Sequence, residues 1–151
     1  MQSDNKSAET IDETLNLRSD LSEIAKVHQW TGRLAVLNSI SADVQFAIDL
    51  CLEEVLSNII RHGYNLEKDR PLTLRFSAPR KSQFVFEIED EAPPFNPLYV
   101  PEMPPLNAEE PIWVGGQGIR LLRRFADALE YEPITGGNRL RLYFLALRPT
   151  A

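Results

Sequence analysis

The chain has 151 residues, of which 43% are apolar, a formal net charge of −6 and one cysteine. This is enough apolar material for one domain with its own core, while the acidic balance argues against a nucleic-acid or anionic-membrane surface, because phosphates would meet no basic excess. No apolar run approaches the ~20 residues of a membrane span. The start, MQSDNKSAET, lacks the basic patch and apolar core of a signal peptide, so we expect a cytoplasmic protein without a membrane anchor.

The first half of the chain predicts one strand followed by two helices. Residues 1–9 are polar and are expected to be disordered, and ETIDETLNLR predicts the strand. Ser19 or Asp20 can cap a first helix that reaches about Ser39, and Ser41 can cap a second one that runs to about His62, where Gly63 is a natural stop. The first helix has inward positions at three- and four-residue spacing: Leu21, Ile24, Val27, Thr31, Leu34 and Leu37.

The second half changes to a period of two. LTLRFSA and FVFEIED, joined by the polar turn PRKSQ, predict a hairpin. The proline-rich stretch that follows, residues 91–117, is either a functional lid or a disordered segment. A short helix from Gly118 to about Ala126 precedes a second hairpin, ALEYEP and NRLRLYFLAL around TGGN. This order predicts an α+β domain with helices layered on one face of a mixed, mostly antiparallel sheet.

One edge of the second helix carries polar residues at four-residue steps: Glu54, Asn58 and His62. On a helical wheel Glu54 lies at the margin of the apolar face, and Asn58 and His62 step into it. The amide oxygen of Asn58 suits Mg²⁺, and Glu54 one turn away can take a proton from a nucleophile. An ordinary amphipathic helix with a polar flank explains the same pattern, with His62 packing locally. The side expected to face solvent carries Asp49, Glu53 and Ser57.

Two further motifs point toward a nucleotide. Asp90 ends a predicted strand, where its carboxylate can accept a hydrogen bond from the exocyclic amine of adenine, although Asp–Pro-rich turns are also common. VGGQGIRLL places three glycines at the start of a helix, whose first N–H groups favour an anion such as phosphate. The helix dipole contributes only about 0.3–1 kcal/mol, so it would orient a phosphate rather than hold a nucleotide alone.

The order of these motifs resembles the GHKL ATPase superfamily: E-x-x-x-N on a helix, D-x-A-P-P-F-N-P after a strand, a long loop, then G-G-x-G. More narrowly, EEVLSNIIRHGY, DEAPPFNP, GGQGIRLL and DALEYEPITGGNRLRLYF resemble the stand-alone serine/threonine kinases that act as bacterial anti-sigma factors. The resemblance covers about residues 10–147. It implies a Bergerat-type ATP-binding fold, a two-layer α/β sandwich over residues 10–151, with an ATP lid at about residues 91–117.

The resemblance also implies the site. ATP and Mg²⁺ are the expected cofactors, with Asn58 as the Mg²⁺ ligand and Glu54 as the catalytic general base. Asp90 matches the aspartate that reads the adenine amino group. The remaining nucleotide-binding residues that it implies are His62, Ala92, Phe95, Gly115, Gly116, Gly118 and Ile119.

Members of this family phosphorylate a small STAS-domain anti-anti-sigma partner, bind a sigma factor and are often homodimers. The resemblance therefore implies a bacterial, cytoplasmic kinase with these two protein partners and no direct nucleic-acid contact. The alternative is a non-catalytic switch module that sequesters a partner, with or without bound nucleotide.

Two departures from the family pattern bear on turnover. Ala92 stands where glycine is usual; a left-handed backbone there would cost alanine roughly 1–2 kcal/mol, whereas a need for smallness alone would be met. Residues 98–114 of the lid contain no lysine, arginine, serine or threonine. Arg61 and Arg120 are the alternatives for a basic group near the last phosphate, and the lid composition is compatible with a slow kinase.

Overall fold

The computed structural model describes residues 13–94 and 114–146, with side chains described from Arg120 onward in the second range. The predictions for residues 1–9, and for all of the lid except its two ends, lie outside the described residues. The described elements, in chain order, are β1 (Glu13–Arg18), a 3₁₀ turn η2 (Leu21–Glu23), α1 (Ile24–Asn38), α2 (Ala42–Asn58), a π-helical turn η3 (Ile59–Gly63), β2 (Pro71–Arg80), β3 (Gln83–Asp90), α3 (Val114–Phe125), β4 (Ala128–Ile134) and β5 (Gly137–Leu145).

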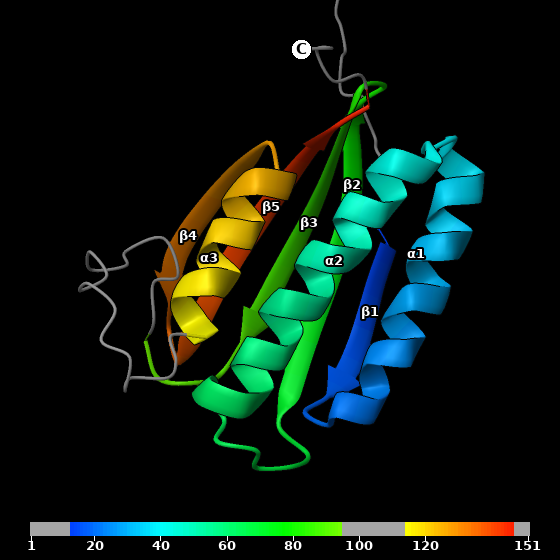
Figure 1. The fold of residues 1–151 in the computed structure, drawn as a ribbon. Coiled ribbons are helices and arrows are strands. Elements are labelled where there is room, and N and C mark those ends of the chain that lie inside the picture. Colours follow the sequence, from blue (N-terminus) through cyan, green and yellow to red (C-terminus); the bar gives the residue numbers. More distant parts are fainter. Residues whose placement is uncertain (1–12, 95–113, 147–151) are drawn as a thin grey trace, which may run out of the picture.

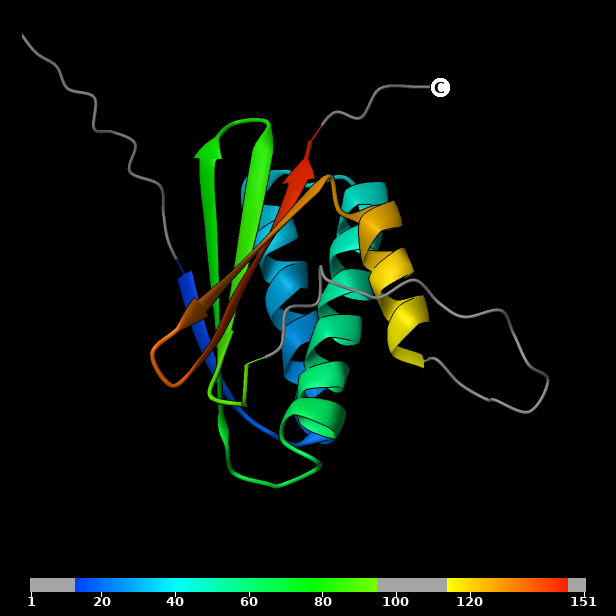
Figure 2. The same ribbon diagram turned by 90° about the vertical axis from the view of Figure 1, so that its left-hand side faces the viewer.

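Two layers make up the fold. The strands form one sheet in the order β1-β2-β3-β5-β4, and the three α-helices all cover the same face of it (Figure 1; Figure 2). The expected α+β sandwich is confirmed. All four strand pairings are antiparallel, so within the described residues the sheet contains no parallel pair and is simpler than the mixed sheet that we expected.

Alternation along the strands separates a dry face from a wet one. The side chains under the helices form the core, and those of the sheet are Leu72, Leu74, Phe76, Phe84, Phe86, Ile88, Leu140, Leu142 and Phe144. The opposite face is closed by ion pairs between strands, among Arg75, Glu87, Glu89, Glu130, Glu132, Arg139 and Arg141. An antiparallel sheet with one buried face accounts for both sets.

Both hairpins form, with tighter turns than we expected. The strands β2 and β3 run on to Arg80 and Gln83, so the connection is Lys81 and Ser82 rather than the five residues PRKSQ, and the register shifts between Ser77 and Arg80. In the second hairpin Gly136 has a φ of +79°, which the two-residue turn requires and which glycine adopts without strain.

The predicted helix starts are confirmed by their caps. Asp20 accepts a hydrogen bond from the N–H of Ser22 at 2.9 Å, and Ser41 Oγ accepts one from the N–H of Val44 at 3.2 Å. No helix in the described part of the chain is long and apolar enough to cross a membrane.

Leu37 on α1 and Asp49 on α2 do not lie where the wheel placed them. Leu37 is 63% exposed, whereas Trp30, which was not among the expected inward positions of α1, is buried with its ring edge-to-face against Phe86. Asp49, expected to face solvent, is half-buried and accepts a hydrogen bond from the buried hydroxyl of Thr31 on α1. The polar residue therefore joins the two helices instead of facing water.

Candidate functional site

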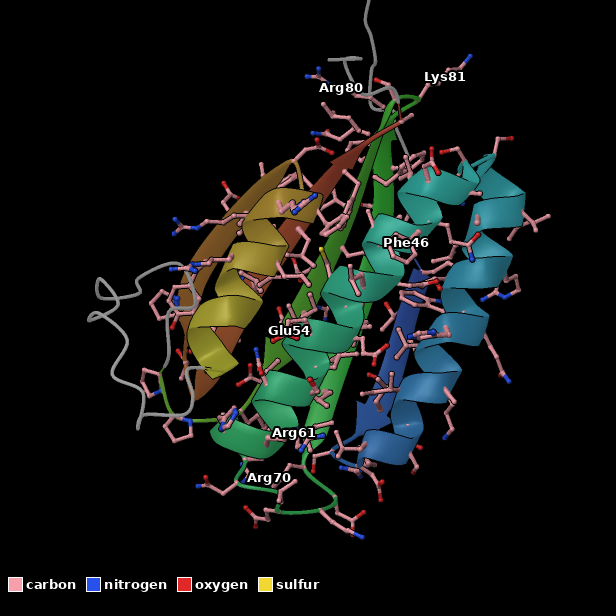
Figure 3. All side chains as sticks on the ribbon, in the orientation of Figure 1. Phe46, Glu54, Arg61, Arg70, Arg80 and Lys81 are labelled. Carbon is pink, nitrogen blue, oxygen red and sulfur yellow. The ribbon has the colours of Figure 1, made fainter. Side chains whose placement is uncertain are left out.

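Glu54 and Asn58 are joined on α2. The side-chain amide of Asn58 donates from Nδ2 to Glu54 Oε2 at 2.9 Å, and both side chains are half-buried. No donor in the described part of the chain reaches Asn58 Oδ1. The carboxylate thus fixes the orientation of the amide and leaves its oxygen available, which is the atom a hard cation would need. Figure 3 shows Glu54 on the side of α2 that faces α3.

The helix ends in a wider turn than the spacing predicted. The backbone N–H of Tyr64 donates to the carbonyl of Ile59 at 2.7 Å, closing the π-helical turn η3 directly after Asn58. A π-turn holds an extra residue, so the four-residue register of the polar edge does not continue through it. His62 is consequently exposed rather than directed into the apolar face. Its predicted role in nucleotide binding stays a prediction.

Gly63 and Tyr64 contact the segment after β3, residues 91 and 92, and so pack the turn η3 against it. A Cβ at Gly63 would lie 3.0 Å from the Cβ of Ala92. The hydroxyl of Tyr64 accepts from the N–H of Glu91 at 2.6 Å and donates to the carbonyl of Pro71 at 2.7 Å. Gly63 was expected as a helix stop. Its φ is not positive, and it is needed for close approach.

Asp90 is 7% exposed at the end of β3, and the described residues donate hydrogen bonds to only one of its two carboxylate oxygens. Oδ1 accepts from the N–H of Ala92 at 2.8 Å and from Asn138 Nδ2 at 2.9 Å. No donor among the described residues reaches Oδ2. Burial raises the pKa of Asp90, and the hydrogen bonds from Asn138 and Ala92 offset only part of that rise. A buried carboxylate with one open oxygen is suited to accept a hydrogen bond from a ligand.

The alanine at position 92 fits without backbone strain. Its φ is not among the positive values of the described residues, and its side chain is 4% exposed. The position therefore demands a small side chain rather than a left-handed backbone, because the methyl group sits on Gly63. The first of the two departures from the family pattern is compatible with the site.

Three residues of the second hairpin complete this corner, and sequence reasoning missed them. Asn138 is 6% exposed and lies opposite Asp90 in the sheet. Tyr131 donates its hydroxyl proton to Asn138 Oδ1 at 2.6 Å. A Cβ at Gly137 would lie 1.8 Å from the carbonyl oxygen of Asp90, so the strand must have glycine there. The GGN sequence was visible as a turn, but its pairing with Asp90 depends on the sheet register.

The helix α3 begins four residues earlier than we expected. It starts at Val114, so Gly115 and Gly116 lie in its first turn and Gly118 lies in the second. The first four N–H groups of an α-helix have no acceptor within the helix, and these belong to residues 114–117 here. Gly115 and Gly116 thus remain placed to offer N–H groups to an anion, whereas Gly118 does not.

For the other candidate residues the structure gives only the element or the exposure, or it does not describe them. Ile119 lies in α3, but its side chain is outside the described part, and so is the whole of Phe95. Arg61 and Arg120 are both exposed, on η3 and on α3. The roles implied for these residues stay predictions.

The elements that carry the candidate residues meet at one end of the molecule. The C-terminal half of α2, the end of β3, the beginning of β5 and the first turn of α3 lie together in the lower part of Figure 1. The helix α2 packs between α1 and α3. An amide oxygen, an open buried carboxylate oxygen and a helix N-terminus are therefore contributed to the same end of the two-layer fold.

Comparison with known families identifies this arrangement. The family model for the histidine kinase-like ATPase domain matches residues 17–144, which is most of the chain. The chain belongs to the histidine kinase-like ATPase family. The matched span includes every element that carries the candidate residues, from α2 to β5.

Two known proteins are similar to this histidine kinase-like ATPase domain. The serine/threonine-protein kinase BtrW of Bordetella bronchiseptica is 27% identical over 130 residues, which are 86% of this chain and 91% of BtrW. The crystal structure of the RsbU and RsbW domains of Rv1364c from Mycobacterium tuberculosis superposes with a TM-score of 0.62 at 12% identity. It covers 90% of this chain and 32% of that one, and it supports the fold.

The residues present fit the nucleotide that such an ATPase domain uses. Asp90 Oδ2 is buried and open to a donor, as the amino group of adenine requires, and Asn58 Oδ1 is open to a cation. Ala92 adds no backbone strain between them. Both oxygens are acceptors, which is the kind of atom that an exocyclic amine or a hard cation needs.

Proposed function

We propose that this histidine kinase-like ATPase is an ATP-dependent protein serine/threonine kinase that acts as an anti-sigma factor. Its substrate would be a serine or threonine of a STAS-domain anti-anti-sigma protein, and its second partner a sigma factor. The observation that carries the proposal is the Glu54–Asn58 pair, in which an amide oxygen that no described residue contacts as a donor lies one helical turn from a half-buried carboxylate. The similarity to the serine/threonine-protein kinase BtrW supports the same reading.

Each chemical task has a residue to perform it. Asp90 would accept a hydrogen bond from the adenine amino group at Oδ2, and the first N–H groups of α3, which have no acceptor within the helix, would face the phosphates. Asn58 would hold Mg²⁺ through Oδ1, and the ion would neutralise charge on the phosphates. Asn58 Nδ2 stays with Glu54 throughout, so the ligand atom keeps its orientation.

The transfer itself needs only one base. The hydroxyl oxygen of the partner attacks the γ-phosphorus of ATP, the bond to the β-phosphate oxygen breaks, and ADP leaves. Glu54 accepts the hydroxyl proton at Oε1, the oxygen that Asn58 does not use.

A non-catalytic switch module is the second candidate, and one observation favours it. Glu54 already has a structural role, because it orients the Asn58 amide. A protein that only binds nucleotide and sequesters a partner would also keep this glutamate. The presence of Glu54 therefore does not separate the two functions.

The substitution Glu54→Gln does separate them. Glutamine retains an acceptor oxygen for Asn58 Nδ2 but cannot take up a proton. We expect Mg²⁺–ATP affinity, measured by calorimetry, to stay within about threefold, and transfer of labelled γ-phosphate to STAS-domain proteins of the same genome to fall by about 10²–10⁴. Glu53→Gln is the matched control, since Glu53 is exposed on the same turn and its carboxylate lies beside His28 of α1.

Two results would contradict the kinase. A Glu54→Gln protein that transfers phosphate as fast as the wild type would exclude Glu54 as the base. A wild type that binds Mg²⁺–ATP but phosphorylates none of these STAS-domain proteins would favour the switch module instead.

A further inference from the structure

Tyr131 lies on β4 and is not one of the candidate ligand-binding residues. Its hydroxyl nevertheless binds Asn138, the residue that holds Asp90. It donates to Asn138 Oδ1 at 2.6 Å, across the pairing of β4 with β5. The ring is half-buried against the core, and Asn138 is 6% exposed. Although β4 is an edge strand, the Tyr131 hydroxyl therefore binds a buried residue and not only solvent.

Contacts at both ends of the Asn138 amide hold it in one orientation. With Oδ1 engaged by Tyr131, Nδ2 faces three acceptors: Asp90 Oδ1 at 2.9 Å, the carbonyl of Ala92 at 3.2 Å and the carbonyl of Pro93 at 3.1 Å. A reversed amide would present its oxygen to three oxygens and its NH₂ group to a hydroxyl. The three acceptors therefore select the orientation that donates to Asp90, and the hydrogen bond from Tyr131 to Oδ1 holds the amide in it.

The orientation of the amide in turn decides which oxygen of Asp90 is open. Asn138 and the N–H of Ala92 both donate to Oδ1, which fixes the carboxylate plane and leaves Oδ2 without a donor in the described chain. Without the Asn138 contact the carboxylate would be held by one hydrogen bond and could rotate. The buried carboxylate would then meet a ligand in more than one orientation.

We propose that Tyr131, acting through Asn138, is a positioning residue for adenine recognition, because it holds Asp90 with one oxygen engaged and the other turned toward the 6-amino group. The inference rests on the proposed nucleotide binding and deepens it. Tyr131 itself touches no ligand in this arrangement. Its effect should therefore be confined to the part of the nucleotide that Asp90 contacts.

The test compares two nucleotides that differ only at that contact. Mg²⁺ complexes of ATP and of purine riboside triphosphate, which lacks the 6-amino group, are titrated by calorimetry against wild type and Tyr131→Phe. We expect the wild type to prefer ATP by about tenfold or more, and Tyr131→Phe to weaken ATP by about five- to tenfold while leaving the second nucleotide within about twofold. Tyr143→Phe is the matched control, because its hydroxyl donates to Glu130 Oε1 at 2.6 Å on the other face of the sheet.

A second variant tests the route through Asn138 and guards against a folding defect. In an Asn138→Ala background, with folding checked by thermal unfolding, adding Tyr131→Phe should change neither affinity further. A merely structural tyrosine would lower both nucleotide affinities together, and that result would overturn the proposal, as would unchanged ATP affinity. A wild type that binds ATP without preferring it would also overturn it. A wild type that binds neither nucleotide at millimolar concentration would instead overturn the proposed function, and the positioning role with it.

Discussion

Asp90 shows how a single residue can be unfavourable for folding and useful for binding. Its side chain is buried, its pKa is raised by that burial, and one oxygen lacks a donor among the described residues. Asn138 and the N–H of Ala92 stabilise the ionised form only in part. A ligand that donates a hydrogen bond to Oδ2 would satisfy the oxygen to which no described residue donates.

Replacing the Asp90 carboxylate with a neutral side chain should therefore stabilise the nucleotide-free protein and weaken its binding of Mg²⁺–ATP. We expect Asp90→Asn to lower Mg²⁺–ATP affinity about 10- to 100-fold, because an amide NH₂ would face the adenine amine. A carboxyl whose pKa is higher in the folded chain contributes stability at pH values below its unfolded pKa and loses it as pH rises through the folded pKa.

Thermal unfolding without nucleotide measures this trade-off. Asp90→Asn should melt above the wild type at pH 7, and the difference should shrink as pH falls through the folded-state pKa of Asp90, where the wild-type carboxyl is neutralised as well. A variant less stable than the wild type at pH 7 would show that Asp90 is fully compensated.

The same raised pKa predicts a pH-dependent base preference. Oδ1 of Asp90 already accepts two hydrogen bonds, so a proton would be taken up at Oδ2, the oxygen proposed for the adenine amine. The preference for ATP over purine riboside triphosphate should fall as pH drops through the Asp90 pKa, which lies above the usual carboxylate value of about 3.9. Phosphate titration is common to both nucleotides and cancels in the ratio. A ratio that does not change as the pH falls through the acidic range would contradict the assignment.

At the scale of elements, the turn η3 joins the two halves of the site. The helix α2 carries Glu54 and Asn58, while β3 ends at Asp90, the carboxylate proposed to read the base. Gly63 and Tyr64, at the end of the π-turn, contact Ala92 and Glu91 respectively. An ordinary α-helical turn would place both residues at other angles, so the wider turn determines how the halves meet.

The contact between Gly63 and Ala92 can be tested by a reciprocal exchange. A methyl group at Gly63 would lie 3.0 Å from the Cβ of Ala92, whose own backbone is tied to Asp90. We expect Gly63→Ala to destabilise the protein by about 1–3 kcal/mol and to weaken ATP binding, as overpacking does. Adding Ala92→Gly should restore most of the loss, measured by denaturant unfolding of the double-mutant cycle.

Gly32 supplies the control for that exchange. A Cβ there would meet only Gln45 Nε2 at 3.8 Å, and the residue lies in the interior of α1. Gly32→Ala should therefore stabilise the protein by about 1 kcal/mol through helix propensity. If Gly63→Ala behaves in the same way, the turn has room and the close contact does not position the Asp90 segment.

At the scale of the whole molecule, a nucleotide would connect α2, β3 and α3, which meet at one end of the sandwich (Figure 1). Binding to the folded state alone stabilises it by about 2.7 kcal/mol at a ligand concentration of 100 Kd. For a chain of this size, that predicts a rise in Tm of about 5–10 °C with Mg²⁺–ATP.

Two variants should differ in how much of this rise in Tm they keep. Glu54→Gln should keep most of it, because the Asn58 amide remains oriented, and Asp90→Asn should lose it. An equal shift with Mg²⁺–GTP would show that the base is not read by Asp90. Differential scanning fluorimetry of the three proteins, each with ATP and with GTP, measures all of these outcomes.

Local chemistry was sufficient for much of this protein. The caps at Asp20 and Ser41, the change of period at β2 and the alternation in β3 depend on neighbouring residues, and the structure bears them out. The order of Glu54, Asn58 and Asp90 along the chain was enough to indicate the family, because the order and spacing of motifs can be read directly from the sequence. Membership then follows from the match over residues 17–144.

The tertiary structure alone decided how those motifs are held. Trp30 is buried against Phe86 while Leu37 on the same helix is exposed, and Gly63 proved to be a contact glycine because Ala92 lies against it. Tyr131 and Asn138 gained a connection to Asp90 through strand pairing across the sheet. Each of these depends on residues distant in the chain, and only the register of the folded sheet and the packing of the helices bring such residues within hydrogen-bond or van der Waals distance.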